Sequence, residues 1–178
     1  YEICGCPWIR DYPFGYKYWV VAESPEYTYI DPLQLGRPVT ISRTNEIEEI
    51  PDLKTYLLTK PPMSVSLNNL AARVKDISKS IWLIHQPPAY LGLDLCGSGV
   101  EVGSLAVYNF LLEKQPLLSI HGHIHEAPEF NGQIWALKLG QTLCIQAGQS
   151  RKELSYVLFD FEDGEIVNLA HSVYGRYR

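Results

Sequence analysis

The sequence predicts a mixed α/β fold on the strength of two patterns. Two short apolar runs, at residues 81–84 and 117–120, are separated by a segment with helical spacing that begins near Ser104. A helix between two such strands makes them parallel neighbours in one sheet. After Glu126 apolar and polar residues alternate, which is typical of antiparallel hairpins. With 178 residues, of which 46% are hydrophobic, the chain is long enough for one core, and we expect a single domain over residues 1–178.

The part of the chain before the first apolar run predicts one strand, a long loop and two helices. Ser66 is the expected N-cap of the second helix, because its hydroxyl can accept a hydrogen bond from a free backbone N–H, and Leu70, Val74 and Ile77 should then point inward. In chain order, these elements are a strand at 2–8, a Tyr/Pro/Gly-rich loop at 9–37 with an extended piece at 18–22, a weak helix at 51–58 and a helix at 67–77.

The last third of the chain predicts two antiparallel hairpins. Their turns fall at Gly140-Gln141 and at Asp163-Gly164, where glycine favours a tight reversal. We expect these strands to form a second sheet beside the parallel one. The predicted strands span residues 133–139, 142–146, 155–161 and 165–173.

Histidines follow both of the apolar runs that predict parallel strands. His121, His123 and His125 alternate directly after the second run, and His85 follows the first. Loops at the ends of neighbouring strands build ligand sites, and neutral imidazole is a common ligand of first-row metal ions. We therefore predict a metal site at His85, His123 and His125, whereas the role of His121 stays open. The fifth histidine, His171, lies in the C-terminal hairpins, where a structural role is expected.

A glycine-rich loop at residues 89–102 follows His85. Its segment Gly97, Ser98 and Gly99 has the composition of loops that bind phosphate through backbone N–H groups, although it lacks the spacing of a P-loop. The alternative is an ordinary loop that crosses the end of the sheet. Its position directly after His85 makes it the best candidate for a substrate-binding lid.

Composition argues against two classes of partner and indicates a compartment. The formal net charge is −5 and lysine and arginine do not cluster, so we expect no strong nucleic-acid patch. The apolar runs are far shorter than the ~20 residues that a membrane-spanning helix needs, and no signal-peptide pattern precedes a cleavage site. The four cysteines are scattered, which is typical of free thiols in a reducing compartment. A cytoplasmic location is therefore expected.

Three motifs resemble the C-terminal half of the calcineurin-like metallophosphoesterases. They are His85-Gln86-Pro87-Pro88, Gly103-Ser104 and Gly122-His123-Ile124-His125. The whole stretch from Trp82 to Glu126 is similar to the small prokaryotic and brain-type members of that superfamily. The resemblance implies the C-terminal half of a four-layer αββα sandwich.

The same resemblance implies a two-metal hydrolase. In the superfamily, the residues that correspond to His85 and His123 ligate one metal ion, and the residue that corresponds to His125 ligates the other. Two ions of manganese, iron or zinc would hold a phosphate ester and a hydroxide that attacks the phosphorus. The implied substrate is a phosphodiester or phosphomonoester, such as a phosphorylated small molecule.

The superfamily's upstream motifs are absent from this sequence. Asp-x-His, Gly-Asp-x-x-Asp and Gly-Asn-His-Asp, which supply the carboxylate and asparagine ligands, do not occur in the 178 residues, and no catalytic residue is assigned in this chain. Because the sequence also starts at Tyr1 rather than at methionine, we expect a missing N-terminal half, and an open sheet edge that pairs with it or forms a homodimer. The alternative is an inactive remnant or regulatory binding domain that holds at most one metal ion.

Overall fold

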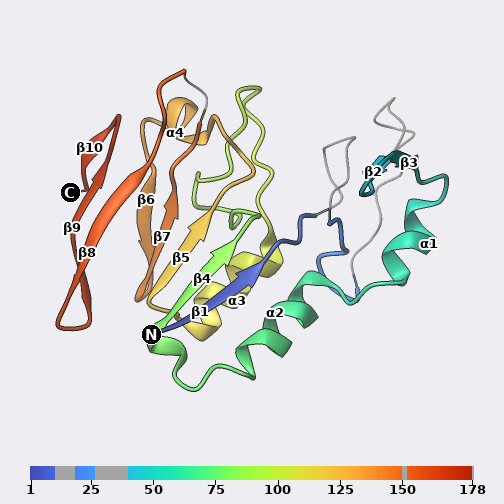
Figure 1. Cartoon of the computed structure of the whole chain (residues 1–178), viewed down its shortest axis with the longest axis horizontal. Helices are drawn as coiled ribbons and strands as arrows, with labels where there is room; N and C mark the ends of the chain where they lie inside the picture. The colour runs from blue at the N-terminus through green and yellow to red at the C-terminus, as the bar shows by residue number, and fades with distance from the viewer. Residues whose placement is uncertain (11–18, 27–39, 150–151, 178) are drawn as a thin grey trace.

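The computed structural model describes residues 1–10, 19–26, 40–149 and 152–177. It contains a five-stranded sheet, with two helices packed on one face and a small second sheet on the other (Figure 1). In chain order, the elements are β1 (Glu2–Cys6), β2 (Thr40–Ser42), β3 (Ile47–Glu49), α1 (Leu53–Leu58), α2 (Met63–Ala71), the 3-10 turn η2 (Ile77–Lys79), β4 (Ser80–Ile84), α3 (Leu105–Lys114), β5 (Leu118–His121), α4 (Ala127–Phe130), β6 (Ala136–Leu139), β7 (Thr142–Gln146), β8 (Val157–Glu162), β9 (Glu165–His171) and β10 (Gly175–Arg176).

The predicted strand–helix–strand unit is confirmed. β4 and β5 are parallel neighbours, with Ile81 opposite Leu118, and α3 connects them. The helix begins where the sequence places it, because the Ser104 side chain accepts a hydrogen bond from the backbone N–H of Val107 at 3.1 Å. It ends at Gln115, which adopts a left-handed conformation. The unit brings the ends of β4 and β5 to the same edge of the sheet.

The strands of the first hairpin do not join the second sheet as expected. The strand order of the large sheet is β1-β4-β5-β7-β6, in which β7 runs parallel to β5 and only β6 is antiparallel to its neighbour. Every residue of β7 is buried, from Thr142 to Gln146. A strand covered on both faces belongs inside a sheet, so the hairpin extends the large sheet and the prediction was wrong on this point.

The second sheet consists of β8, β9 and β10, all antiparallel. It covers the face of the large sheet opposite the helices, where Leu169 packs with Leu118, Leu143 and Ile145 in one apolar cluster. The helices α2 and α3 pack on the other face, around the fully buried Trp82. The part of the chain that the structure describes thus forms helix, sheet and sheet layers.

Helix α2 starts one turn earlier than the sequence indicates. Its first N–H groups donate to carbonyl oxygens of a distant segment, Met63 to Ala22 at 2.8 Å and Ser64 to Glu23 at 3.0 Å. This remote cap satisfies the helix end, so the expected cap, Ser66, lies inside the helix and is buried. The side chains expected to point inward, Leu70, Val74 and Ile77, all pack against the core, although the last two follow the helix.

Strand β1 is an edge strand that is shorter than predicted. It pairs in parallel with β4 along Glu2–Cys6 and has no partner on its other side among the strands that the structure describes. On the sheet face away from the helices, Ile3 is 69% exposed and Leu83 is 46% exposed. The second sheet therefore leaves β1 and part of β4 uncovered on this face.

The expected loop at 9–37 lies mostly outside the described residues. The part that is described forms an isolated bridge between Ile9 and Val20, and this bridge packs in a second apolar cluster with α1. The weak helix predicted at 51–58 is present as α1. No helix in the described ranges has the length and apolarity to cross a bilayer.

Candidate functional site

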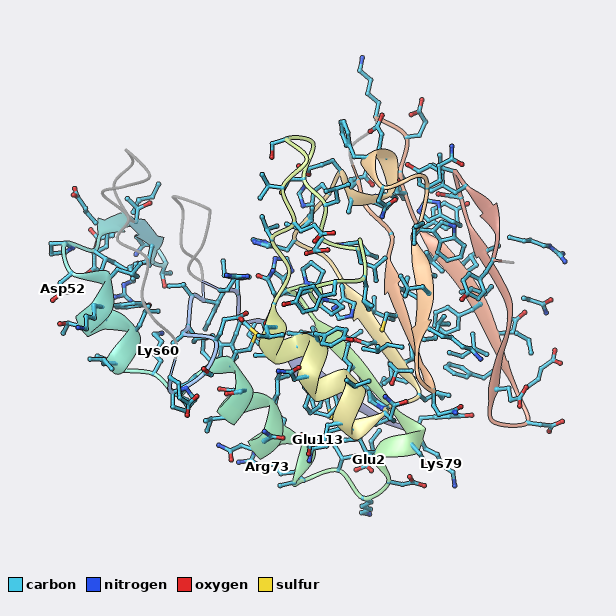
Figure 2. All side chains as sticks on the ribbon, turned by 180° about the vertical axis from the view of Figure 1, so that it is seen from behind. Glu2, Asp52, Lys60, Arg73, Lys79 and Glu113 are labelled. Atoms are coloured by element: carbon cyan, nitrogen blue, oxygen red, sulfur yellow. The ribbon has the colours of Figure 1, made fainter. Side chains whose placement is uncertain are left out.

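The loops that carry the histidines lie side by side at the carboxyl edge of the large sheet. His85 follows β4, and Gly122 follows β5, and the Gly122 N–H donates to the His85 carbonyl oxygen at 3.1 Å. A Cβ on Gly122 would lie 3.3 Å from Nδ1 of His85. The glycine therefore leaves room for the imidazole of His85 against the backbone of the histidine-rich segment. Figure 2 shows Glu2 and Lys79 at the far, amino-terminal edge of this sheet.

His85 and His123 are in contact. Their ring centroids are 5.1 Å apart with an angle of 63° between the ring planes. His123 adopts a left-handed backbone conformation with φ of 65°, which costs a residue other than glycine about 1–2 kcal/mol. The same conformation occurs at turn positions such as Gln115 and Asp163, so the contact between the two rings is the stronger observation. The structure thus brings together two of the three predicted ligands, one from each loop.

His125 lies close enough to His85 to influence its protonation. Loss of hydration lowers the pKa of His85, and the nearby His125 lowers it further. Both side chains are exposed to solvent, and His123 is half-buried. Within the described ranges, however, no three His, Cys, Asp or Glu side chains are arranged to hold a metal ion. The described histidines therefore do not make a metal site by themselves, and a metal ion here would need further ligands.

His121, whose role the sequence left open, is a structural residue. It is 6% exposed, and its Nδ1 lies 3.1 Å from the carbonyl oxygens of both Ile84 and Gln86. Because carbonyl oxygens only accept, Nδ1 carries the proton, and Nε2 accepts from the Ser119 hydroxyl at 2.7 Å. Burial lowers the pKa of His121 to about 4. The neutral ring thus fixes the backbone on both sides of His85.

The glycine loop is attached to the histidine segment. The Gly97 N–H donates to Oε1 of Glu126 at 3.2 Å, and Glu126 directly follows His125. The Gly99 N–H donates to the Cys96 carbonyl oxygen at 2.9 Å. Both amides already donate to acceptors within the protein, so a phosphate could bind them only by displacing those acceptors. Phosphate binding by Gly97, Ser98 and Gly99 remains a prediction.

Asp94, inside this loop, is hydrogen-bonded to Gly103, which directly follows the loop, and sequence reasoning did not anticipate this contact. Asp94 is fully buried, its Oδ2 accepts from the Gly103 N–H at 2.6 Å, and burial raises the pKa of its carboxyl group. The Gly103 carbonyl oxygen accepts from Nη1 of Arg10 at 2.6 Å. Both Asp94 and Gly103 lie between Trp82 and Glu126, in the segment that carries the predicted site, and this position was the available signal. They shape the loop beside His85 without reaching the histidines themselves.

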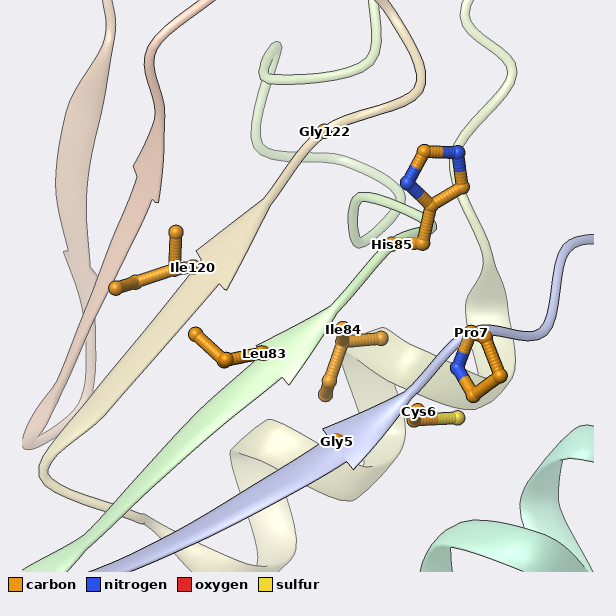
Figure 3. Close-up of a pocket in the computed structure, with 8 residues that line it drawn as sticks. All are labelled: Gly5, Cys6, Pro7, Leu83, Ile84, His85, Ile120 and Gly122. Carbon is orange, nitrogen blue, oxygen red and sulfur yellow. The ribbon is translucent and has the colours of Figure 1, made fainter. Parts of the chain in front are cut away.

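An open pocket of about 440 Å³ lies next to His85, on the uncovered face of the sheet (Figure 3). It is formed where β1, β4 and β5 end, so it could not be read from any single segment of the sequence. Its lining residues are Gly5, Cys6, Pro7, Leu83, Ile84, His85, Ile120 and Gly122.

The remaining histidine stands apart from the site. His171 is buried, with Nε2 2.8 Å from the Ala147 carbonyl oxygen and Nδ1 accepting from the Val173 N–H at 3.0 Å. Its predicted structural role is confirmed. All four cysteines are free thiols, as expected.

Compared with models of protein families, with curated proteins and with solved structures, the chain has no match.

Proposed function

We propose that this chain provides the histidine ligands of a metal-dependent phosphoester hydrolase. In this proposal, His85 and His123 hold one divalent ion, and His125 holds a second. The observation that carries it is the contact between His85 and His123 at the carboxyl edge of parallel strands, with His123 in a strained conformation. Loops at this edge are the usual place for a ligand site in an open α/β sheet.

The histidines suit a metal ion in their protonation as well as in their position. A histidine ligates through a neutral nitrogen, so metal binding competes with protons. The lowered pKa of His85 favours the neutral form of its ring, which is the form that binds a metal ion. His121 anchors the backbone before and after His85 and so limits the movement of this ligand. Manganese, iron and zinc all accept imidazole nitrogen.

The bound ions would lower the pKa of a water molecule, orient the phosphate and stabilise the leaving oxygen. The proposal requires carboxylate ligands in addition to the three histidines, because the family's Asp and Asn motifs do not occur in this sequence. We propose that they come from an N-terminal half that completes the four-layer sandwich. The free thiols fit the cytoplasm as its location.

The test is hydrolysis of bis(p-nitrophenyl) phosphate, in the presence of Mn²⁺, by the chain joined to the N-terminal half that the proposal requires. We expect release of p-nitrophenol that depends on the metal ion and is lost in His123→Ala. His171→Gln is the matched control, because it removes a histidine that lies outside the cluster. Hydrolysis that survives both chelation and His123→Ala would exclude the proposal.

A second candidate function is a metal-binding domain without hydrolytic activity. It is favoured by the sequence, which lacks the Asp and Asn motifs that would supply the other ligands of a two-metal site. Under this alternative, the chain binds one ion at most and releases no p-nitrophenol. The same assay, combined with the number of metal ions bound per chain, separates the two candidates.

A further inference from the structure

A groove of about 430 Å³ lies in the helix layer, on the face of the large sheet opposite the second sheet. Helix α2 contributes Ser64 and Asn68 to its walls, and α3 contributes Leu105, Asn109 and Glu113. Residues four positions apart share one face of a helix, so the groove follows α3 for about two turns. The segment at 23–26, which precedes β2, completes it. Its volume is within the ~300–1,000 Å³ typical of small-molecule sites.

The charged side chains that line this groove are all acidic. They are Glu23, Glu26 and Glu113, and no lysine, arginine or histidine among the described residues lines it. Glu113 is paired with Lys114, whose Nζ lies 2.7 Å from its Oε1, but this contact is largely exposed and of the kind that contributes little. Within the described ranges, Glu23 and Glu26 take part in no ion pair. The charge of the groove therefore favours a cation.

Glu23 is a buried carboxylate with one oxygen left over. The residue is only 7% exposed, and its Oε2 accepts a hydrogen bond from the N–H of Leu105, the first residue of α3, at 3.1 Å. Its Oε1 is buried and has no hydrogen-bond partner in the part of the chain that the structure describes. A buried carboxylate oxygen without a donor costs free energy, so buried polar atoms normally have a partner. An ammonium group in the groove would supply this donor together with the opposite charge.

The two ends of the groove are acidic and the stretch between them is apolar. Glu23 contacts the start of α3, and Glu113 lies eight residues after Leu105, near the end of the helix (Figure 2). Eight residues of α-helix span about 12 Å. Between these ends, the buried side chains of Ala106 and Phe110 line the groove. No three acidic side chains among the described residues are arranged to hold a metal ion, so the groove suits an elongated organic cation better than a metal.

We propose that this groove binds a linear aliphatic diamine or polyamine, with one ammonium group at Glu23 and another at Glu113. The alkyl chain between the two charges lies on the apolar surface of Ala106 and Phe110 and gains free energy from burial there. The inference goes beyond the proposed function and does not depend on it, because none of the predicted metal ligands lines the groove.

The experiment is an NMR titration of the isotope-labelled chain, without added metal, with the terminal diamine of octane, the terminal diamine of butane, and octylamine. The amide shifts give the dissociation constants and locate the site. The octane diamine alone has two ammonium groups far enough apart to reach both carboxylates. We therefore expect it to bind at least about threefold more tightly than the other two amines, with the largest shifts in α2 and α3.

Three variants assign the binding to these carboxylates. Glu23→Gln should weaken binding of the octane diamine about tenfold, because it removes the charge while an amide of the same size can still accept from the Leu105 N–H. Glu165→Gln is the matched control, because it removes an equal charge from exposed β9, and it should leave the dissociation constant unchanged. Glu113→Gln alters an exposed helix position and should lower the affinity for the octane diamine to that for octylamine.

Four results would overturn the inference. They are a lack of saturable binding, equal affinities for the three amines, shifts that lie mainly outside α2 and α3, and an equal loss of affinity in Glu23→Gln and Glu165→Gln. The last result would mean unspecific attraction to a chain with a net charge of −5. Thermal melts establish that the variants fold. If Glu23→Gln does not fold, Glu113→Gln decides, and an unchanged affinity for the octane diamine in that variant would also overturn the inference.

Discussion

The buried imidazole of His121 should make the chain less stable as the pH falls below neutrality. In the folded chain its pKa is lowered from 6.5 to about 4, because a charged ring would lose its hydration there. In the unfolded chain the ring takes up a proton below its ordinary pKa. Between these values the unfolded state binds more protons, so stability is complete above pH 6.5 and is lost as pH falls toward 4. Each tenfold difference in proton affinity is worth about 1.4 kcal/mol, which gives a loss of about 3 kcal/mol by pH 4.

Urea unfolding followed by tryptophan fluorescence measures this loss at pH 7 and at pH 4.5, with a chelator present. The comparison is between the wild-type chain and His121→Gln, whose amide can still donate a hydrogen bond but does not titrate. At pH 7 the variant should be less stable, because one side chain cannot satisfy all the partners of the imidazole. Between pH 7 and pH 4.5, the wild type should lose about 2–3 kcal/mol more than the variant.

Other titrating groups influence the same pH range, His85 and Asp94 among them, so the difference between the two proteins is the quantity to compare. His85 acts in the same direction as His121, because its pKa is also lowered. Asp94 acts in the opposite direction, because its pKa is raised and protonation favours the folded state. His85→Gln should keep most of the wild-type loss. An equal loss in wild type and His121→Gln would refute the assignment of this pH dependence to His121.

Two further predictions concern the loop and the core. Gly103→Ala should lower the free energy of unfolding by more than about 2 kcal/mol. The reason is that the new Cβ would lie 2.5 Å from the Pro88 carbonyl oxygen and 2.6 Å from Oδ2 of Asp94. Chemical denaturation measures the change, and a value under about 0.5 kcal/mol would contradict the packing at this position. Iodoacetamide at pH 8 should modify Cys4 and Cys96 in the folded chain but Cys144 only after unfolding. Cys144 is fully buried, and burial raises its pKa to about 12. Peptide mass spectrometry identifies the modified cysteines, and modification of Cys144 before the other two would contradict this prediction.

The parts of the fold that could be predicted are those determined by local sequence. The strand–helix–strand unit from β4 to β5 follows from two apolar runs and from Ser104, whose hydroxyl caps the helix that directly follows it. The position of β7 could not be predicted in this way, because its pattern indicates a strand but not its partner. Its buried residues pair with β5, although α4 and β6 lie between the two strands in sequence. The start of α2 was missed for the same reason, since the carbonyl groups that cap it belong to Ala22 and Glu23, which precede β2, β3 and α1.

In the candidate site, too, the features set by local sequence could be predicted and those set by distant contacts could not. Parallel strands bring their ends together, so the contact between His85 and His123 could be expected from two sequence motifs. The function of His121 depends on the carbonyl oxygens of Ile84 and Gln86, which belong to another segment of the sequence. The sequence around His121 does not indicate these partners. The pocket depends on β1, which lies beside β4 although two strands and two α-helices separate them in sequence.

The number of metal ions bound per chain tests the central claim most directly. The chain, purified and equilibrated with Mn²⁺, Fe²⁺ or Zn²⁺, is analysed by plasma mass spectrometry beside His123→Ala and His171→Gln. At least one ion per chain, lost in His123→Ala and kept in His171→Gln, is the result that the account predicts. An absence of bound metal, or equal occupancy in His123→Ala and the wild type, would contradict it.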